Sequence, residues 1–207
     1  MMHLRDYFEQ PLSGTSLERG VESDWLDLCE LSIPSGKLSM GDPFTFPDAQ
    51  AKVRVVGGNY KVQAKAFDYG NHRRISRLRA CLDEDPYDVL EIDEFPVDAG
   101  VAGVCEYPKF KAARKIALKA DADFEDKLID YLENEEFGVI KLGDAQVAYV
   151  MSGWGDGFYS VFVYLNEQGK KVGCEAVFID DDQNIFANLT NFDTALPEDE
   201  EKTDENH

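Results

Sequence analysis

The chain has 207 residues, of which 43% are hydrophobic, and this size predicts one substantial core and one domain or at most two small ones. With 41 acidic against 21 basic residues, the net charge of −20 disfavours binding to nucleic acid and to anionic membranes and favours a basic partner. The sequence contains no export signal and no run of about 18 apolar residues, so we expect a cytoplasmic protein.

Four widely spaced cysteines carry no metal-binding or disulfide pattern. Without a Cys-x-x-Cys pair, they are expected to be reduced and mostly buried thiols: Cys29, Cys81, Cys105 and Cys174. Histidines are too few and too scattered for a zinc site, and no nucleotide-binding loop occurs, so no cofactor is predicted.

The first predicted elements are two strands, 52–56 and 60–67, joined by Gly57-Gly58-Asn59 as a hairpin. A third strand at 75–82 continues them as a meander. Its start is basic, and strand periodicity predicts that Arg73, Arg77 and Arg79 share one face. These arginines either form salt bridges with the neighbouring acidic segment or bind an anion such as phosphate.

Residues 83–98 form that acidic segment, with eight acidic residues, no basic one and two prolines. This composition predicts an exposed loop or sheet edge. Its four central acidic residues, Asp88, Glu91, Asp93 and Glu94, are interspersed with apolar side chains that could anchor a partner.

Two segments have helical features. Residues 109–120 fit a helix or a strand, whereas 121–136 place Phe124, Leu128, Tyr131 and Leu132 at helical spacing with acidic residues opposite. Four strands follow, at 138–142, 146–151, 159–165 and 172–179, and form two antiparallel hairpins. The fold class is therefore α+β, mostly antiparallel β-sheet with one or two packed helices. Residues 1–196 are predicted to form a single globular domain, and 197–207 an acidic disordered tail.

The sequence Ser-Gly-Trp-Gly-Asp-Gly at 152–157 places Trp154 and Asp156 in a glycine-rich turn before an aromatic strand. Trp154 is either a lid over the core or a surface on which a ligand stacks.

Three other stretches also combine aspartate with glycine or proline: the SGK-x4-DP sequence that ends at Asp42-Pro43, the DAG-x-AG sequence at 98–103, and the strand that ends at Asp180. Together with the Gly58-x-Tyr60-x-Val62 pattern and SGWGDG, these stretches resemble an uncharacterised bacterial family of unknown function over roughly residues 30–182. The resemblance implies one β-rich domain and supplies no reaction.

Two classes of function remain open. Asp42, Asp98 and Asp156 each lie at a turn or strand end, where carboxylates could converge as a hydrolase site or hold a small polar ligand. Aspartates at such positions also commonly accept hydrogen bonds from turn amides. The interpretation we prefer is an acidic protein-binding module, such as an immunity or inhibitor protein that neutralises a basic bacterial toxin domain, because it accounts for both the charge and the missing catalytic groups. Its binding residues would be Trp154, Asp156 and the four acidic residues of 88–94.

Overall fold

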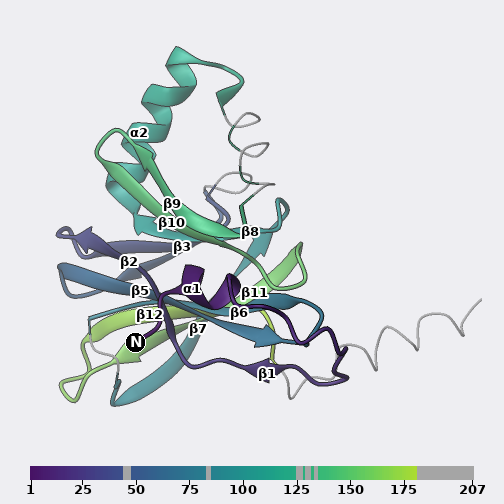
Figure 1. Cartoon of the computed structure of the whole chain (residues 1–207). Coiled ribbons are helices and arrows are strands. Elements are labelled where there is room, and N and C mark those ends of the chain that lie inside the picture. Colours follow the sequence, from purple (N-terminus) through teal and green to yellow (C-terminus); the bar gives the residue numbers. More distant parts are fainter. Residues whose placement is uncertain (44–47, 83–84, 125–127, 129–131, 133–134, 181–207) are drawn as a thin grey trace, which may run out of the picture.

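A computed structural model describes residues 1–43, 48–82, 85–124, 128, 132 and 135–180. Two antiparallel sheets lie one above the other, with helix α2 beyond the smaller sheet (Figure 1). The chain is therefore mostly antiparallel β-sheet with little helix, as the alternating sequence patterns predict.

The larger sheet has the strand order β1-β5-β6-β12-β11-β7, and β2 also pairs with β5. Its strands are β1 (Val21–Glu22), β2 (Leu26–Ile33), β5 (Gly58–Asp68), β6 (Arg73–Cys81), β7 (Asp88–Val97), β11 (Gly157–Leu165) and β12 (Lys171–Val177). The strand β7 ends this order, so it forms one edge of the sheet.

The smaller sheet has the order β4-β3-β8-β10-β9. Its strands are β3 (Lys37–Gly41), β4 (Ala51–Arg54), β8 (Val101–Glu106), β9 (Phe137–Leu142) and β10 (Ala145–Met151).

Apolar side chains from both sheets meet in one main hydrophobic cluster. It contains Val62 and Leu78 of the larger sheet and Leu38, Val104 and Val150 of the smaller one, all of them buried. Alternate residues of each strand supply this layer because successive side chains of a strand point to opposite faces.

Helix α2 (Tyr107–Ala120) packs on the outer face of the smaller sheet, where Phe110 is buried against Cys105 and Val147. The pattern of 109–120 fitted either a helix or a strand, and the structure shows a helix that begins with Pro108 in its first turn, a position where proline is tolerated. The short helix α1 (Leu4–Phe8) contacts β2.

The predicted helix over 121–136 is described only in part. Phe124, Leu128 and Leu132 are helical, and Leu132 is buried against Val101 and Tyr149 of the smaller sheet. Tyr131 lies outside the described residues, as does the predicted acidic tail at 197–207.

Three predicted strand pairings are confirmed, namely β5 with β6, β9 with β10 and β11 with β12. The hairpin predicted from 52–56 and 60–67 is wrong, because β4 pairs with β3 in the smaller sheet and β5 belongs to the larger one. Between them the chain crosses from sheet to sheet beside the connection from β2 to β3, with the Val55 amide donating to the Gly36 carbonyl at 2.9 Å. The glycines at this crossing serve close backbone contact, since a Cβ atom on Gly57 would lie 2.7 Å from the Pro34 carbonyl oxygen.

Candidate functional site

Of the three aspartates predicted to converge, Asp42 and Asp156 bind the backbone of the turn that carries Asp98, residues 98–100 between β7 and β8. Asp42 Oδ2 accepts hydrogen bonds from the amides of Asp98 at 3.2 Å and Ala99 at 3.4 Å, and Asp156 Oδ1 accepts one from Gly100 at 3.0 Å. Asp42 is fully buried, whereas Asp98 and Asp156 are exposed. Two of the carboxylates therefore fix the backbone that carries the third. Asp180, the other aspartate at a strand end, is exposed after β12.

The SGWGDG turn, residues 152–157, is hydrogen-bonded to the same 98–100 turn. The Ser152 amide donates to the Gly100 carbonyl at 2.8 Å, and Tyr159 Oη donates to the Gly155 carbonyl at 2.6 Å. Gly153 has a φ of +51°, and a Cβ atom there would lie 2.9 Å from the Ile179 side chain, so this position needs glycine. The turn is thus rigid and presents Trp154 from a fixed base.

Trp154 is 37% exposed and belongs to a cluster of flat side chains in which Tyr69 is buried. Its ring lies 5.7 Å from that of Tyr69 and 6.3 Å from that of His72, and the Arg74 guanidinium carbon lies 5.3 Å from its centroid. Tyr69 and His72 are themselves stacked, at 4.9 Å and an interplanar angle of 14°. Trp154 therefore supports Arg74 by a cation–π contact.

The arginines of β6 do not form one stripe. The register of β5 and β6 shifts between Lys65 and Ala66, which leaves one extra residue between Ile75 and Arg77 and places Arg73 on the opposite face from Arg77 and Arg79. The expectation of a shared face is wrong because strand periodicity holds only while the register is regular.

Arg73, Arg77 and Arg79 have polar partners inside the molecule. Arg73 pairs with Asp68 at 2.9 Å, and Arg77 pairs with Glu175 at 2.9 Å. Arg79 donates to Gln63. Arg73 and Arg77 thus form internal salt bridges, but their acidic partners lie outside the 83–98 segment with which the sequence analysis paired them.

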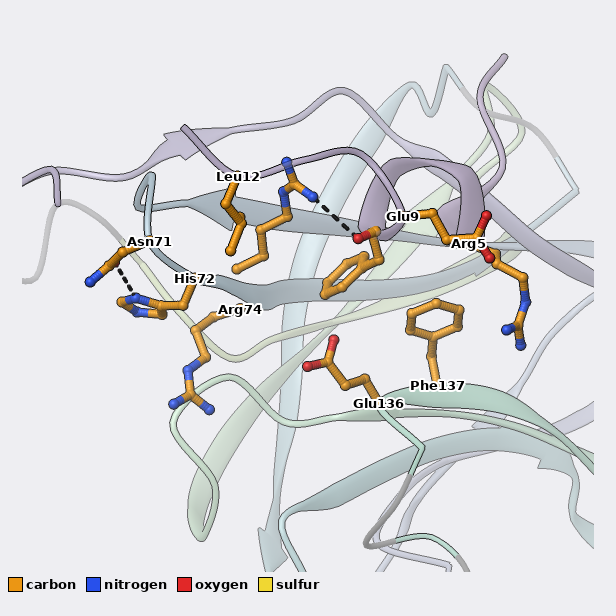
Figure 2. Close-up of a pocket in the computed structure, with 10 residues that line it drawn as sticks. Arg5, Glu9, Leu12, Asn71, His72, Arg74, Glu136 and Phe137 are labelled. Carbon is orange, nitrogen blue, oxygen red and sulfur yellow. Dashed lines mark hydrogen bonds between the residues drawn. The ribbon is translucent and has the colours of Figure 1, made fainter. Parts of the chain in front are cut away.

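A cavity of about 530 Å³ opens beside this cluster (Figure 2). Its walls come from three distant parts of the chain: residues 5–12 in and after α1, 71–74 at the start of β6, and 136–137 at the start of β9. Volumes of roughly 300–1,000 Å³ are typical of small-molecule sites. No sequence motif marks this cavity, and of its residues only Arg73, which belongs to the basic run His72-Arg73-Arg74, is a candidate from the sequence.

The cavity carries charges of both signs. Arg5 and Arg74 line it together with Glu9 and Glu136, and Figure 2 shows the Glu136 carboxylate directed toward the side where Arg74 lies. Desolvation by surrounding protein atoms raises the pKa of Glu136, and the positive charge of Arg74 opposes that rise.

The acidic segment contains the edge strand β7, in agreement with the prediction of an exposed loop or edge. Side chains from Asp88 to Glu94 are all exposed, among them the four acidic residues singled out in the sequence. Val89, Leu90 and Ile92 are exposed by 45, 46 and 40%. No strand of the described residues pairs with the outer edge of β7. Residues 83–84 of the acidic segment lie outside the described part.

Within the described residues, no group of three or more His, Cys, Asp or Glu side chains is arranged to hold a metal ion. The four cysteines are free, and three of them are buried. None of the helices described here has both the length and the apolar character needed to cross a membrane.

Comparison with known proteins gives one family. Residues 77–174, from β6 to β12, match the model of a family described as a protein of unknown function (DUF4241). No curated protein and no solved structure matches the chain. The chain is thus similar, over a span that includes the 98–100 and 152–157 turns, to a family whose function is not known.

Proposed function

We propose that the chain is a protein-binding module that captures a basic protein through the edge strand β7. The observation that supports it is the run of exposed side chains from Asp88 to Glu94, which includes four carboxylates, three apolar residues and no basic residue. We propose further that the partner is a basic bacterial toxin domain and that this chain is its cytoplasmic immunity or inhibitor protein.

An edge strand offers unpaired backbone groups to which another strand can add. Natural sheets commonly protect such edges with charged side chains, and here the register of β7 with β11 also shifts, between Val161 and Phe162. Acidic side chains repel a second copy of β7, whereas they attract a strand that carries Lys or Arg. We therefore expect β7 to select a basic strand by charge and to hold it by backbone hydrogen bonds.

The net charge supports the same proposal. At −20, the chain attracts a positively charged protein over the range of the Debye length, about 30 Å at 0.01 M salt and about 10 Å at 0.1 M. The exposed apolar residues Val89, Leu90 and Ile92 would supply contact area once the partner has docked.

The hydrolase alternative, or a small-ligand site on the same residues, would use Asp42, Asp98 and Asp156. We favour protein binding over it, because Asp42 and Asp156 already accept hydrogen bonds from turn amides and Asp42 is fully buried.

The test uses a purified basic, toxin-like protein encoded beside this chain. A variant with Asp88, Glu91, Asp93 and Glu94 changed to Lys is compared with a control in which Glu18, Asp123, Asp144 and Glu167, all exposed and outside β7, are changed to Lys. Both variants have the same net charge, so only a contact at β7 separates them. We expect the β7 variant to lose binding by a factor of at least about 100 and the control by about 10 or less.

Equal losses in the two variants would mean that net charge, not β7, determines binding. A third variant that ends at Leu196 tests the acidic tail, and loss of binding there alone would assign the contact to the tail. If the neighbouring protein binds none of the forms, the proposal is wrong.

A further inference from the structure

Two arginines that line the cavity beside α1 have no acidic partner among the described residues. Among the described residues, Arg5 and Arg74 form no ion pair within 4.0 Å, although acidic residues outnumber basic ones by almost two to one. Arg73 and Arg77, in contrast, are paired. An arginine that lines a cavity without a carboxylate partner is available to bind the carboxylate of a ligand.

Glu136 lines the same cavity and is also without an ion pair in the described residues. Arg74 is close enough to lower the pKa of Glu136, yet the two side chains do not form an ion pair. The cation–π contact with Trp154 explains the separation, since it holds the Arg74 guanidinium at 5.3 Å from the indole centroid. A cation and an anion thus line one cavity without forming an ion pair with each other.

The cavity also has three apolar lining residues, Phe8, Leu12 and Phe137. The rings of Phe8 and Phe137 lie 5.2 Å apart in an edge-to-face arrangement, and Leu12 lines the same cavity (Figure 2). Such surfaces favour a ligand with an apolar group beside its charged ones.

We propose that this cavity binds the zwitterion of an α-amino acid with an apolar side chain: Arg74 would bind the carboxylate, Glu136 the ammonium group, and the Phe8–Phe137 surface the side chain. A ligand with only one charge would leave either Arg74 or Glu136 without an oppositely charged partner. A zwitterion satisfies both side chains at once, and the volume leaves space for water around it. The proposal is independent of the β7 surface, because none of the residues that line the cavity belongs to β7.

The test is calorimetric titration of the full chain with three probes of similar shape. L-phenylalanine carries both charges, 3-phenylpropionate lacks the ammonium group, and 2-phenylethylamine lacks the carboxylate. We expect L-phenylalanine to bind at least about tenfold more tightly than either analogue, since each charged hydrogen bond lost is worth a factor of ten or more.

Two variants assign the charges. Arg74→Gln should remove the preference for L-phenylalanine over 2-phenylethylamine, and Glu136→Gln the preference over 3-phenylpropionate. Arg54→Gln, which removes an exposed arginine of β4 outside the cavity, should change each affinity by less than about twofold. Because Arg74 and Glu136 are exposed, neither substitution should impair folding, which thermal unfolding of each variant checks.

Three results would overturn the proposal. The first is no binding of L-phenylalanine to the unaltered chain at millimolar concentration. The second is equal binding of 3-phenylpropionate, which would indicate a simple anion site instead. The third is a pattern of preferences that Arg74→Gln and Glu136→Gln leave unchanged.

Discussion

Asp42 and Asp156 bind successive amides of the same turn. Asp42, at the end of β3, accepts from Asp98 and Ala99, and Asp156, after β10, accepts from Gly100. One turn between the sheets therefore depends on two distant carboxylates, which explains why three aspartate-containing segments of the sequence come together without forming an open acidic cluster.

This relationship predicts unequal losses of stability. Asp42→Ala should lower the free energy of unfolding by about 1.5–3 kcal/mol, because it removes a buried carboxylate that accepts two hydrogen bonds. Asp156→Ala should lower it by about 0.5–1.5 kcal/mol, because that side chain is exposed. Urea unfolding measures both values, with Asp144→Ala in the exposed turn between β9 and β10 as the control. A loss for Asp156→Ala larger than that for Asp42→Ala would contradict this account.

Trp154→Ala distinguishes a surface support from a core lid. A fully buried tryptophan would cost about 3–5 kcal/mol, but Trp154 is 37% exposed and contacts Tyr69, His72 and Arg74. We expect a loss of about 1–2 kcal/mol from the lost ring contacts. The comparison is Phe110→Ala, which removes a buried ring of α2 and should lower the free energy of unfolding by about 3–5 kcal/mol. Thermal and urea unfolding measure the loss of stability in each variant. Equal losses would indicate that Trp154 acts as a lid over the core.

Local sequence signals predicted the local parts of this fold. The pairs β9–β10 and β11–β12 are joined by short turns, so alternation and turn residues were enough to find them. The crossing at Gly57 has the same turn chemistry as a hairpin, and only the contact of Val55 with Gly36, a residue of another connection, shows that the chain changes sheets there. The pairing of β7 with β11 joins distant segments and has no signal in either one.

The candidate cavity was not predictable for the same reason. Arg5, Arg74 and Glu136 lie far apart in the chain and belong to no motif, so only the packing of α1 near β6 and β9 brings them together. The basic run at 72–74 was visible in the sequence. The irregular register at Ser76, which separates Arg73 from Arg77 and Arg79, was not.

The cysteines should be nearly inert in the folded chain. Burial raises the pKa of Cys29 and of Cys105 from about 9 to about 12, and it also raises that of Cys174. Because the thiolate is the reactive form, a shift of three units lowers the reaction rate near pH 8 by about a thousandfold. Labelling with a thiol reagent, native and in denaturant, tests this. Rapid labelling of native Cys29, the one that is not fully buried, would show that its surroundings open in solution.

Tyr164 should make the chain lose stability in alkali. Its hydroxyl donates to Glu175 Oε2, and burial first and the Glu175 charge second raise its pKa above the usual value of 10. The pKa of Tyr164 is higher in the folded chain than in the unfolded one. The protonated hydroxyl therefore contributes its full stabilisation to the folded chain below about pH 10, and this stabilisation is lost as the pH rises above that value. The loss should reach about 1.4 kcal/mol per pH unit from this residue.

Tyr164→Phe is the matching variant, and unfolding in urea between about pH 9 and pH 11 is the measurement. Other buried tyrosines, Tyr60 among them, also have raised pKa values, so the informative quantity is the difference between the two proteins. The variant should show the shallower decline above about pH 10. Parallel declines would mean that Tyr164 ionises equally easily in the folded and unfolded chains.

Arg73 should hold α1 in place and with it one wall of the cavity. Its Nη1 donates to the carbonyls of Tyr7 at 2.9 Å and Gln10 at 2.8 Å, and its Nε donates to Asp68 at 2.9 Å. These carbonyls lie at and beyond the end of the helix, where intrahelical donors are absent. A planar guanidinium reaches them and the carboxylate simultaneously, which the single ammonium group of lysine cannot do.

Arg73→Lys should therefore keep the positive charge but lose the simultaneous hydrogen bonds to the α1 carbonyls and to Asp68. Hydrogen exchange of the amides in residues 4–12 should become faster by about tenfold or more, corresponding to about 1.4 kcal/mol, while exchange in β11 and β12 stays unchanged. Arg74→Lys is the control, because Arg74 lies over Trp154 and forms no hydrogen bond with α1 among the described residues. If the two variants accelerate exchange in 4–12 equally, the charge of the basic run and not the guanidinium contacts of Arg73 stabilises this wall.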